Sequence, residues 1–110
     1  MTEAQTILDM LEAVTEDTPT ETLDEIDYLV WTIANRKDPF YTGVPMYTRS
    51  RDALKAVRPD GVVIQVRYYP EGFQGDAVGS KGQSPRLPTE ELAELHAIVQ
   101  AIEWERTHEE

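Results

Sequence analysis

The chain has 110 residues, enough for one compact domain, and 21 acidic against 10 basic side chains give it a formal net charge of -11. With 40% hydrophobic residues it resembles folded domains more than disordered chains. The absence of cysteine excludes a disulfide framework, a zinc–thiolate site and a thiol nucleophile. The start lacks a secretory signal pattern, and no apolar stretch approaches the ~20 residues that span a bilayer. We therefore expect a cytoplasmic protein, in the host cell cytoplasm if it is phage-encoded, without an extended basic DNA-binding surface.

The charge is unevenly distributed along the chain. Residues 1–35 contain nine acids and no Lys or Arg, and residues 89–110 contain seven acids and a single Arg. Residues 36–88 between them have nine basic side chains and five acids. The sequence thus places two acidic ends around a mildly basic middle, and the acids either solvate helix faces or form a functional acidic surface.

Two amphipathic helices are predicted in the first third of the chain. The first covers residues 2–14, where apolar side chains recur at helical spacing. The second runs from about 23 to 34, and Thr22 with Glu25 forms a capping box at its start. Trp31 lies beside the apolar stripe of this helix, and we expect it in the core.

The middle of the chain begins with an unusually apolar loop. This loop covers residues 35–47 and is punctuated by proline and glycine, so it either packs on the domain or carries a binding surface. A short helix is predicted over 49–57, and either Thr48 or Ser50 can cap it.

A β-hairpin is predicted next. The alternation over 62–69 is the clearest strand signal, and a Pro-Glu-Gly turn leads to a weaker strand over 73–78, which contains Gly75. A flexible loop over 79–88 then precedes a final helix with Thr89 as N-cap.

These elements predict a single α+β domain, residues 1–110. It would consist of a small antiparallel β-hairpin sheet packed with about four helices. We expect residues 1–19 to be an N-terminal helical extension, 20–106 the α/β core and 107–110 a frayed tail.

One segment is similar to a known family. The run Tyr47-Thr48-Arg49-Ser50-Arg51-Asp52-Ala53 followed by Pro59-Asp60-Gly61 resembles the aromatic-Thr-x-Ser-x-Asp-Ala opening and Pro-x-Gly turn of the phage ABA sandwich family. Gly82-Gln83-Ser84-Pro85 before a helix rich in Leu and Ala is similar to the closing element of that family. The resemblance covers roughly residues 26–106. It implies an ABA-sandwich-like α/β fold and an origin in a phage or prophage, and it brings no catalytic residues.

The candidate chemistry in the chain is sparse. His96 and His108 are twelve residues apart, which is not the i, i+4 spacing of a helical metal pair. His96 could form a weak metal or acid–base pair with Glu103 or Gln100, but a hydrogen-bonded structural histidine is the favoured interpretation. No Ser-His-Asp set is evident. We expect no enzyme, no cofactor and no metal site.

The first functional hypothesis is a non-enzymatic, acidic phage-type accessory protein that binds and inhibits a host protein. A nucleic-acid-handling defence component is the expected target, because helical carboxylates can occupy a basic channel where phosphates would lie, in the manner of an anti-CRISPR or DNA-mimic protein. The candidate partner-binding residues are Asp9, Glu12, Glu16, Asp17, Glu21, Asp24, Glu25 and Asp27, with Tyr28 and Trp31 as aromatic anchors.

An alternative hypothesis is a homo-oligomer that binds and sequesters an anionic nucleotide signal of host defence. Basic side chains would hold the phosphates and tyrosines would stack on the base. The residues of this candidate site are Arg49, Arg51, Lys81, Arg86, Tyr41, Tyr47, Tyr68 and Tyr69. The same cations could instead pair with the surplus of acids. A third possibility is a phage assembly or regulatory dimer.

The predicted sheet also favours self-association. One strong and one weak strand make a marginal sheet, and an exposed strand edge invites pairing with a second copy. We therefore expect a homodimer or a larger homo-oligomer.

Overall fold

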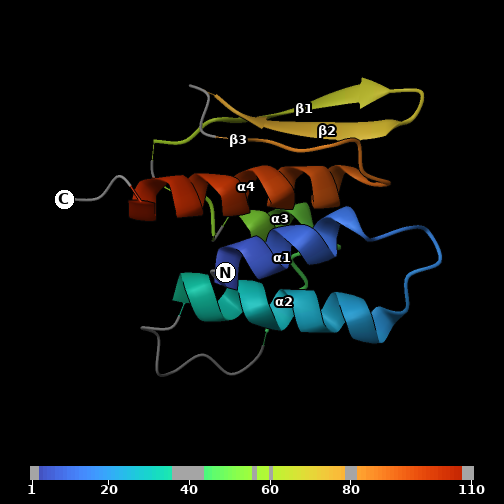
Figure 1. Ribbon diagram of the computed structural model, residues 1–110, viewed down its shortest axis with the longest axis horizontal. Helices are drawn as coiled ribbons and strands as arrows, with labels where there is room; N and C mark the ends of the chain where they lie inside the picture. The colour runs from blue at the N-terminus through green and yellow to red at the C-terminus, as the bar shows by residue number, and fades with distance from the viewer. Residues whose placement is uncertain (1–2, 36–43, 56, 60, 79–81, 108–110) are drawn as a thin grey trace.

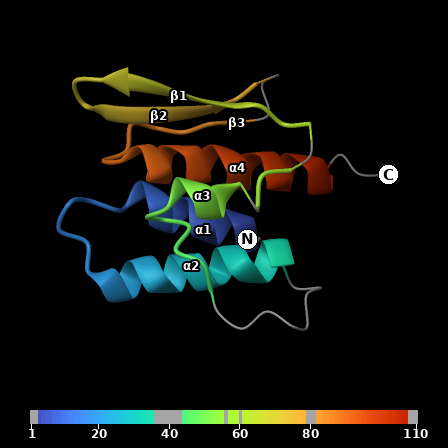
Figure 2. The same cartoon turned by 180° about the vertical axis from the view of Figure 1, so that it is seen from behind.

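A computed structural model describes residues 3–35, 44–55, 57–59, 61–78 and 82–107, and it confirms the α+β class. Its elements in chain order are α1 (Glu3–Glu12), α2 (Thr20–Asn35), α3 (Arg51–Leu54), β1 (Ile64–Tyr69), β2 (Gly72–Ala77), β3 (Gly82–Gln83) and α4 (Glu90–Thr107). The described helices all lie on one side of the sheet (Figure 1). From the sheet outward come α4, then α1 with α3, and finally α2, an order that is also clear from behind (Figure 2). None of the described helices is long and apolar enough to cross a membrane.

The central element is α4, which lies between the sheet and α1 (Figure 1). Each residue from Leu92 to Val99 is buried. A helix that is covered on both sides needs small or apolar side chains all round, rather than a single stripe. Thr89 caps the start of α4 as predicted, because its Oγ1 accepts a hydrogen bond from the Leu92 N–H at 3.2 Å.

The second predicted strand, β2, forms over its full length, and Gly75 within it packs directly against α4. β2 pairs antiparallel with β1 from Tyr69↔Gly72 to Ile64↔Ala77. A Cβ added at Gly75 would lie 2.0 Å from the Ala93 carbonyl oxygen of α4. The residue that weakens the strand signal in the sequence is thus the one that lets the sheet approach α4 closely.

The segment predicted as a flexible loop over 79–88 is largely ordered against β2, where the structure describes it. β3 pairs antiparallel with the end of β2, and Phe73 and Leu87 form a further antiparallel bridge. The buried Ser84 hydroxyl accepts a hydrogen bond from the Gly75 N–H at 2.8 Å. The expectation of a loop is therefore wrong for residues 82–83 and for Leu87, because tertiary pairing with β2 orders residues that lack strand propensity.

The first helix belongs to the core and is not an extension of it. Ala4, Ile7 and Leu11 of α1 are fully buried and lie in the same apolar cluster as Leu95 and Ile98 of α4. α1 also packs on α2. The division into an extension over 1–19 and a core over 20–106 is therefore wrong, because α1 fills the layer between α4 and α2 (Figure 1).

The remaining elements differ from the prediction mainly at their boundaries. α2 begins at Thr20, before the expected start, and Trp31 is half-buried against the core. α3 is shorter than predicted, and Ser50 is its N-cap, since its hydroxyl accepts from the Ala53 N–H at 3.4 Å. In β1, Ile64 is half-buried against the core, whereas Tyr68 is 64% exposed.

Candidate partner-binding surface

Most of the predicted acidic residues gather where α1 ends and α2 begins. The two helices pack side by side in opposite directions, so the end of α1, the connecting turn and the first turns of α2 share one end of the molecule (Figure 1). The exposed carboxylates of this region, here called the acidic end, are Glu12, Glu16, Asp17, Glu21, Asp24 and Glu25. Asp9 is exposed one turn earlier on α1, where it accepts a hydrogen bond from Gln5 at 3.0 Å.

The outer face of α2 continues this surface toward two aromatic side chains. Glu21, Glu25 and Tyr28 follow one another at i, i+4 and i+7, and α2 is the layer farthest from the sheet (Figure 2). Tyr28 is 53% exposed, and its ring centroid lies 6.1 Å from that of the half-buried Trp31. Among the described residues, no basic side chain lies within ion-pair distance of Glu21 or Glu25.

Asp27 does not belong to this surface, which corrects the prediction. It is only 2% exposed, and its carboxylate accepts from the Thr48 N–H at 2.8 Å and from Arg49 Nη2 at 2.7 Å. The same Arg49 nitrogen donates to Asp24 at 2.6 Å. The hydrogen bond that Arg49 donates to Asp27 is the main cause that raises the pKa of Arg49 above its ordinary value, and the one to Asp24 adds to it. These hydrogen bonds hold residues 47–50 against α2. Asp27 therefore has a structural role, and Arg49 is already paired within the chain.

Arg51 is likewise occupied by acids of its own chain. Its guanidinium reaches Glu90 and Glu94 of α4, each at 2.8 Å. The hydrogen bonding of Arg51 to the Glu94 carboxylate, which accepts, is the main cause that raises the pKa of Arg51 above its ordinary value. The Glu94 side chain is 7% exposed, so this pair satisfies a nearly buried carboxylate.

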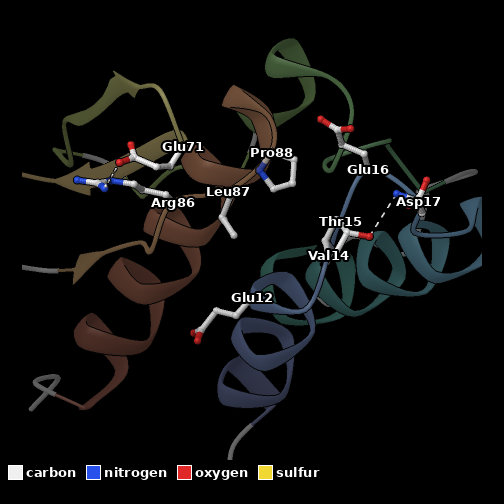
Figure 3. Close-up of a pocket in the computed structure, with 9 residues that line it drawn as sticks. All are labelled: Glu12, Val14, Thr15, Glu16, Asp17, Glu71, Arg86, Leu87 and Pro88. Atoms are coloured by element: carbon white, nitrogen blue, oxygen red, sulfur yellow. Dashed lines mark hydrogen bonds and ion pairs between the residues drawn. The ribbon is translucent and has the colours of Figure 1, made fainter.

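A cleft of about 400 Å³ separates the acidic end from the β1–β2 turn (Figure 3). Four carboxylates line it, namely those of Glu12, Glu16, Asp17 and Glu71. Arg86 is the single basic residue of its lining. It pairs with Glu71 at 3.3 Å and stacks over the Tyr69 ring at 4.2 Å from the centroid. The cleft therefore has a net negative lining, which disfavours a phosphate group and suits a cationic one.

The structure brings Arg86 and Tyr69 of the alternative nucleotide site together, whereas Arg49 and Arg51 pair with acids on other elements. Arg49, Arg51 and Arg86 pair with acids of α2, of α4 and of the β1–β2 turn, respectively. Tyr47 is fully buried, so its predicted role in base stacking is wrong. Tyr68 is the most accessible of the described tyrosines, and its ring contacts Phe73 edge-on at 5.2 Å. Lys81 and Tyr41 lie outside the described residues.

His96 is a buried structural histidine. It is 1% exposed, and its Nε2 lies 3.1 Å from the Glu12 carboxylate, so it links α4 to α1. Burial lowers the pKa of His96 below its ordinary value, although the hydrogen bond to Glu12 opposes that shift. The neutral imidazole can donate its Nε2–H to Glu12. Glu12, and not the proposed Glu103 or Gln100, is thus its partner.

No protein-family model matches the chain, and no curated protein or solved structure matches it either.

Helical spacing could have predicted that two polar residues, Asp27 and His96, are buried. Asp27 is four residues after Leu23 and three before Val30, which places it on the buried stripe of α2. His96 stands in the same relation to Leu92 and Val99 on α4. Their partners are 21 to 84 residues away in the chain, so no local pattern identifies them.

Proposed function

We propose that this chain is a non-enzymatic, acidic accessory protein of the phage type, and that it binds and inhibits a host protein that handles nucleic acid. In this proposal the acidic end and the outer face of α2 occupy a basic surface of the target. Carboxylates there take the positions of phosphates, and Tyr28 adds apolar contact beside them.

The observation that carries the proposal is that three arginines are paired within the chain, whereas acidic side chains on the outer face of α2 have no such partner among the described residues. Arg49, Arg51 and Arg86 are all paired with acids of their own chain. By contrast, Glu21 and Glu25 on the outermost helix have no described cation beside them. A polyanionic ligand would have to break internal ion pairs, whereas a basic partner meets carboxylates that are already solvated and free to pair.

The non-enzymatic part of the proposal rests on the inaccessibility of the His96 side chain. Its imidazole is buried and bonded to Glu12, so it cannot reach a substrate without rearrangement of α1.

The test is a pull-down from nuclease-treated host lysate with the immobilised protein. We expect a basic protein to be captured and then released by double-stranded DNA or by salt, because exposed charge pairs are screened over about 8 Å near physiological ionic strength. The variant Glu21→Lys/Glu25→Lys should abolish capture and still melt cooperatively. A control with the same charge change, Asp52→Lys/Glu91→Lys, should retain it.

Two outcomes contradict this proposal. Capture that is equally strong with the α2 variant and the control excludes the outer face of α2 as the contact. A nucleotide that copurifies with the protein, and is lost in Arg86→Ala, supports the sequestration alternative instead.

A further inference from the structure

The first strand of the sheet has one edge that no described strand covers, and hydrogen bonds fix the directions of its backbone groups. β1 is at one end of the strand order β1–β2–β3. The Val78 N–H donates to the Val63 carbonyl at 2.9 Å, so Val63 points its backbone groups toward β2. On the far side of β2, Phe73 and Leu87 exchange both backbone hydrogen bonds at 2.8 Å. Both observations agree on which residues of the antiparallel ladder point their backbone N–H and C=O groups toward which neighbouring strand.

This alternation determines which residues of β1 direct their backbone groups toward the outer edge of the sheet. Backbone groups alternate between the two sides of a strand, so Ile64, Val66 and Tyr68 direct their N–H and C=O groups away from β2. Among the described residues, no strand pairs with them. β1 contains neither proline nor lysine, and its pairing with β2 runs without a bulge. Arg67 is its one charged residue, so the strand has few of the devices that usually protect an edge.

The same three residues carry incompletely covered apolar side chains. Ile64 and Val66 are half-buried, and Tyr68 is 64% exposed although it shares their face of the sheet. A strand added at this edge would continue the apolar row and cover these side chains.

We propose that β1 pairs antiparallel with β1 of a second copy, about a two-fold axis at Val66, to form one six-stranded sheet. In this register Val66 faces its symmetry mate, Ile64 faces Tyr68, and Gln65 faces Arg67. Arg67, the charged residue of β1, then opposes a neutral amide and keeps its own Asp76 at 3.6 Å. An axis at Arg67 would instead place two guanidinium groups opposite each other, which is unfavourable.

This interface lies across the molecule from the outer face of α2 (Figure 1), so the proposal is independent of the proposed function. It also gives the small sheet a stable size, since a hairpin with a two-residue third strand is marginal by itself.

Single cysteines can test the register, because the natural chain contains none. Opposed residues of a hydrogen-bonded antiparallel pair have Cα atoms ~5.5 Å apart, within the range of a disulfide. Val66→Cys should therefore form a covalent dimer under mild oxidation. Gln65→Cys alone should not, because its symmetry mate is displaced along the strand to beyond ~7 Å. An equilibrated mixture of Gln65→Cys and Arg67→Cys should cross-link.

Light scattering during size-exclusion chromatography tests the interface itself. The wild type should have twice the 12.5 kDa chain mass. Val66→Pro should stay folded, because the missing N–H belongs to the free edge, but it should dimerise about ten-fold more weakly or not at all. Tyr68→Glu changes an exposed side chain, so the chain should stay folded while the dimer weakens. A wild-type mass of 12.5 kDa at high concentration overturns the proposal, as does a dimer that neither variant weakens and Val66→Cys fails to cross-link.

Discussion

At the residue scale, two aspartates three positions apart on α2 differ sharply in what they do. Asp27 is buried and bonded to Thr48 and Arg49, whereas the Asp24 side chain is 62% exposed although it meets the same arginine. We expect Asp27→Asn to lower the free energy of unfolding by about 1–3 kcal/mol, because it removes the buried charge from the hydrogen bonds to Arg49 and Thr48 and leaves Arg49 with the exposed Asp24 alone. Asp24→Asn should cost under about 1 kcal/mol. Urea unfolding of both variants checks this, and equal losses would contradict it.

His96 should give the protein a pH-dependent stability. Burial holds its folded pKa below the ordinary value of 6.5, so the unfolded chain takes up the proton first as pH falls. The stability that depends on neutral His96 is therefore complete well above pH 6.5 and is lost as pH falls through 6.5 and below.

Urea unfolding of the wild type and of His96→Gln from about pH 8 to 5 measures this contribution. The advantage of the wild type should shrink toward acid pH, while titration of the carboxylates affects both proteins. A constant difference between them would show that His96 does not titrate on unfolding.

At the element scale, α1 supplies much of the core between α4 and α2, so the fold should depend on it. Leu11 is fully buried in the cluster that α1 shares with α4, so Leu11→Ala should lower the free energy of unfolding by about 2–5 kcal/mol. Removal of residues 1–14 should abolish the cooperative thermal transition in circular dichroism. Ala13→Ser, at an exposed position just after α1, is the matched control and should have little effect. A truncated chain that still melts cooperatively would refute the central role of α1.

At the scale of the whole molecule, the net charge of -11 repels itself in the compact state. We expect the melting temperature to rise by about 4 °C or more from low salt to ~0.5 M NaCl, because screening relieves that repulsion more than it weakens the buried ion pairs. The Glu21→Lys/Glu25→Lys variant, with less excess charge, should respond less. A melting temperature that falls with salt would mean that attractive pairs dominate.

The sequence by itself determined the features that depend on neighbours along the chain. Helical spacing, the Thr89 cap and the alternation of β1 identify the α+β class and most of the elements, because caps and amphipathic faces depend on residues close together in the chain. The excess of exposed acid on α1 and α2 also follows from composition.

Tertiary structure decided what depends on contacts distant in sequence. The Arg51–Glu94 and His96–Glu12 pairs join residues 43 and 84 positions apart, and no spacing rule links them. β3 exists because β2 offers an edge, and α1 is core because α4 requires cover on its second face. Whether a charge is solvated or structural depends on which chain segment packs over it. For that reason Asp24 remained at the surface while Asp27, three residues on, became part of the interior.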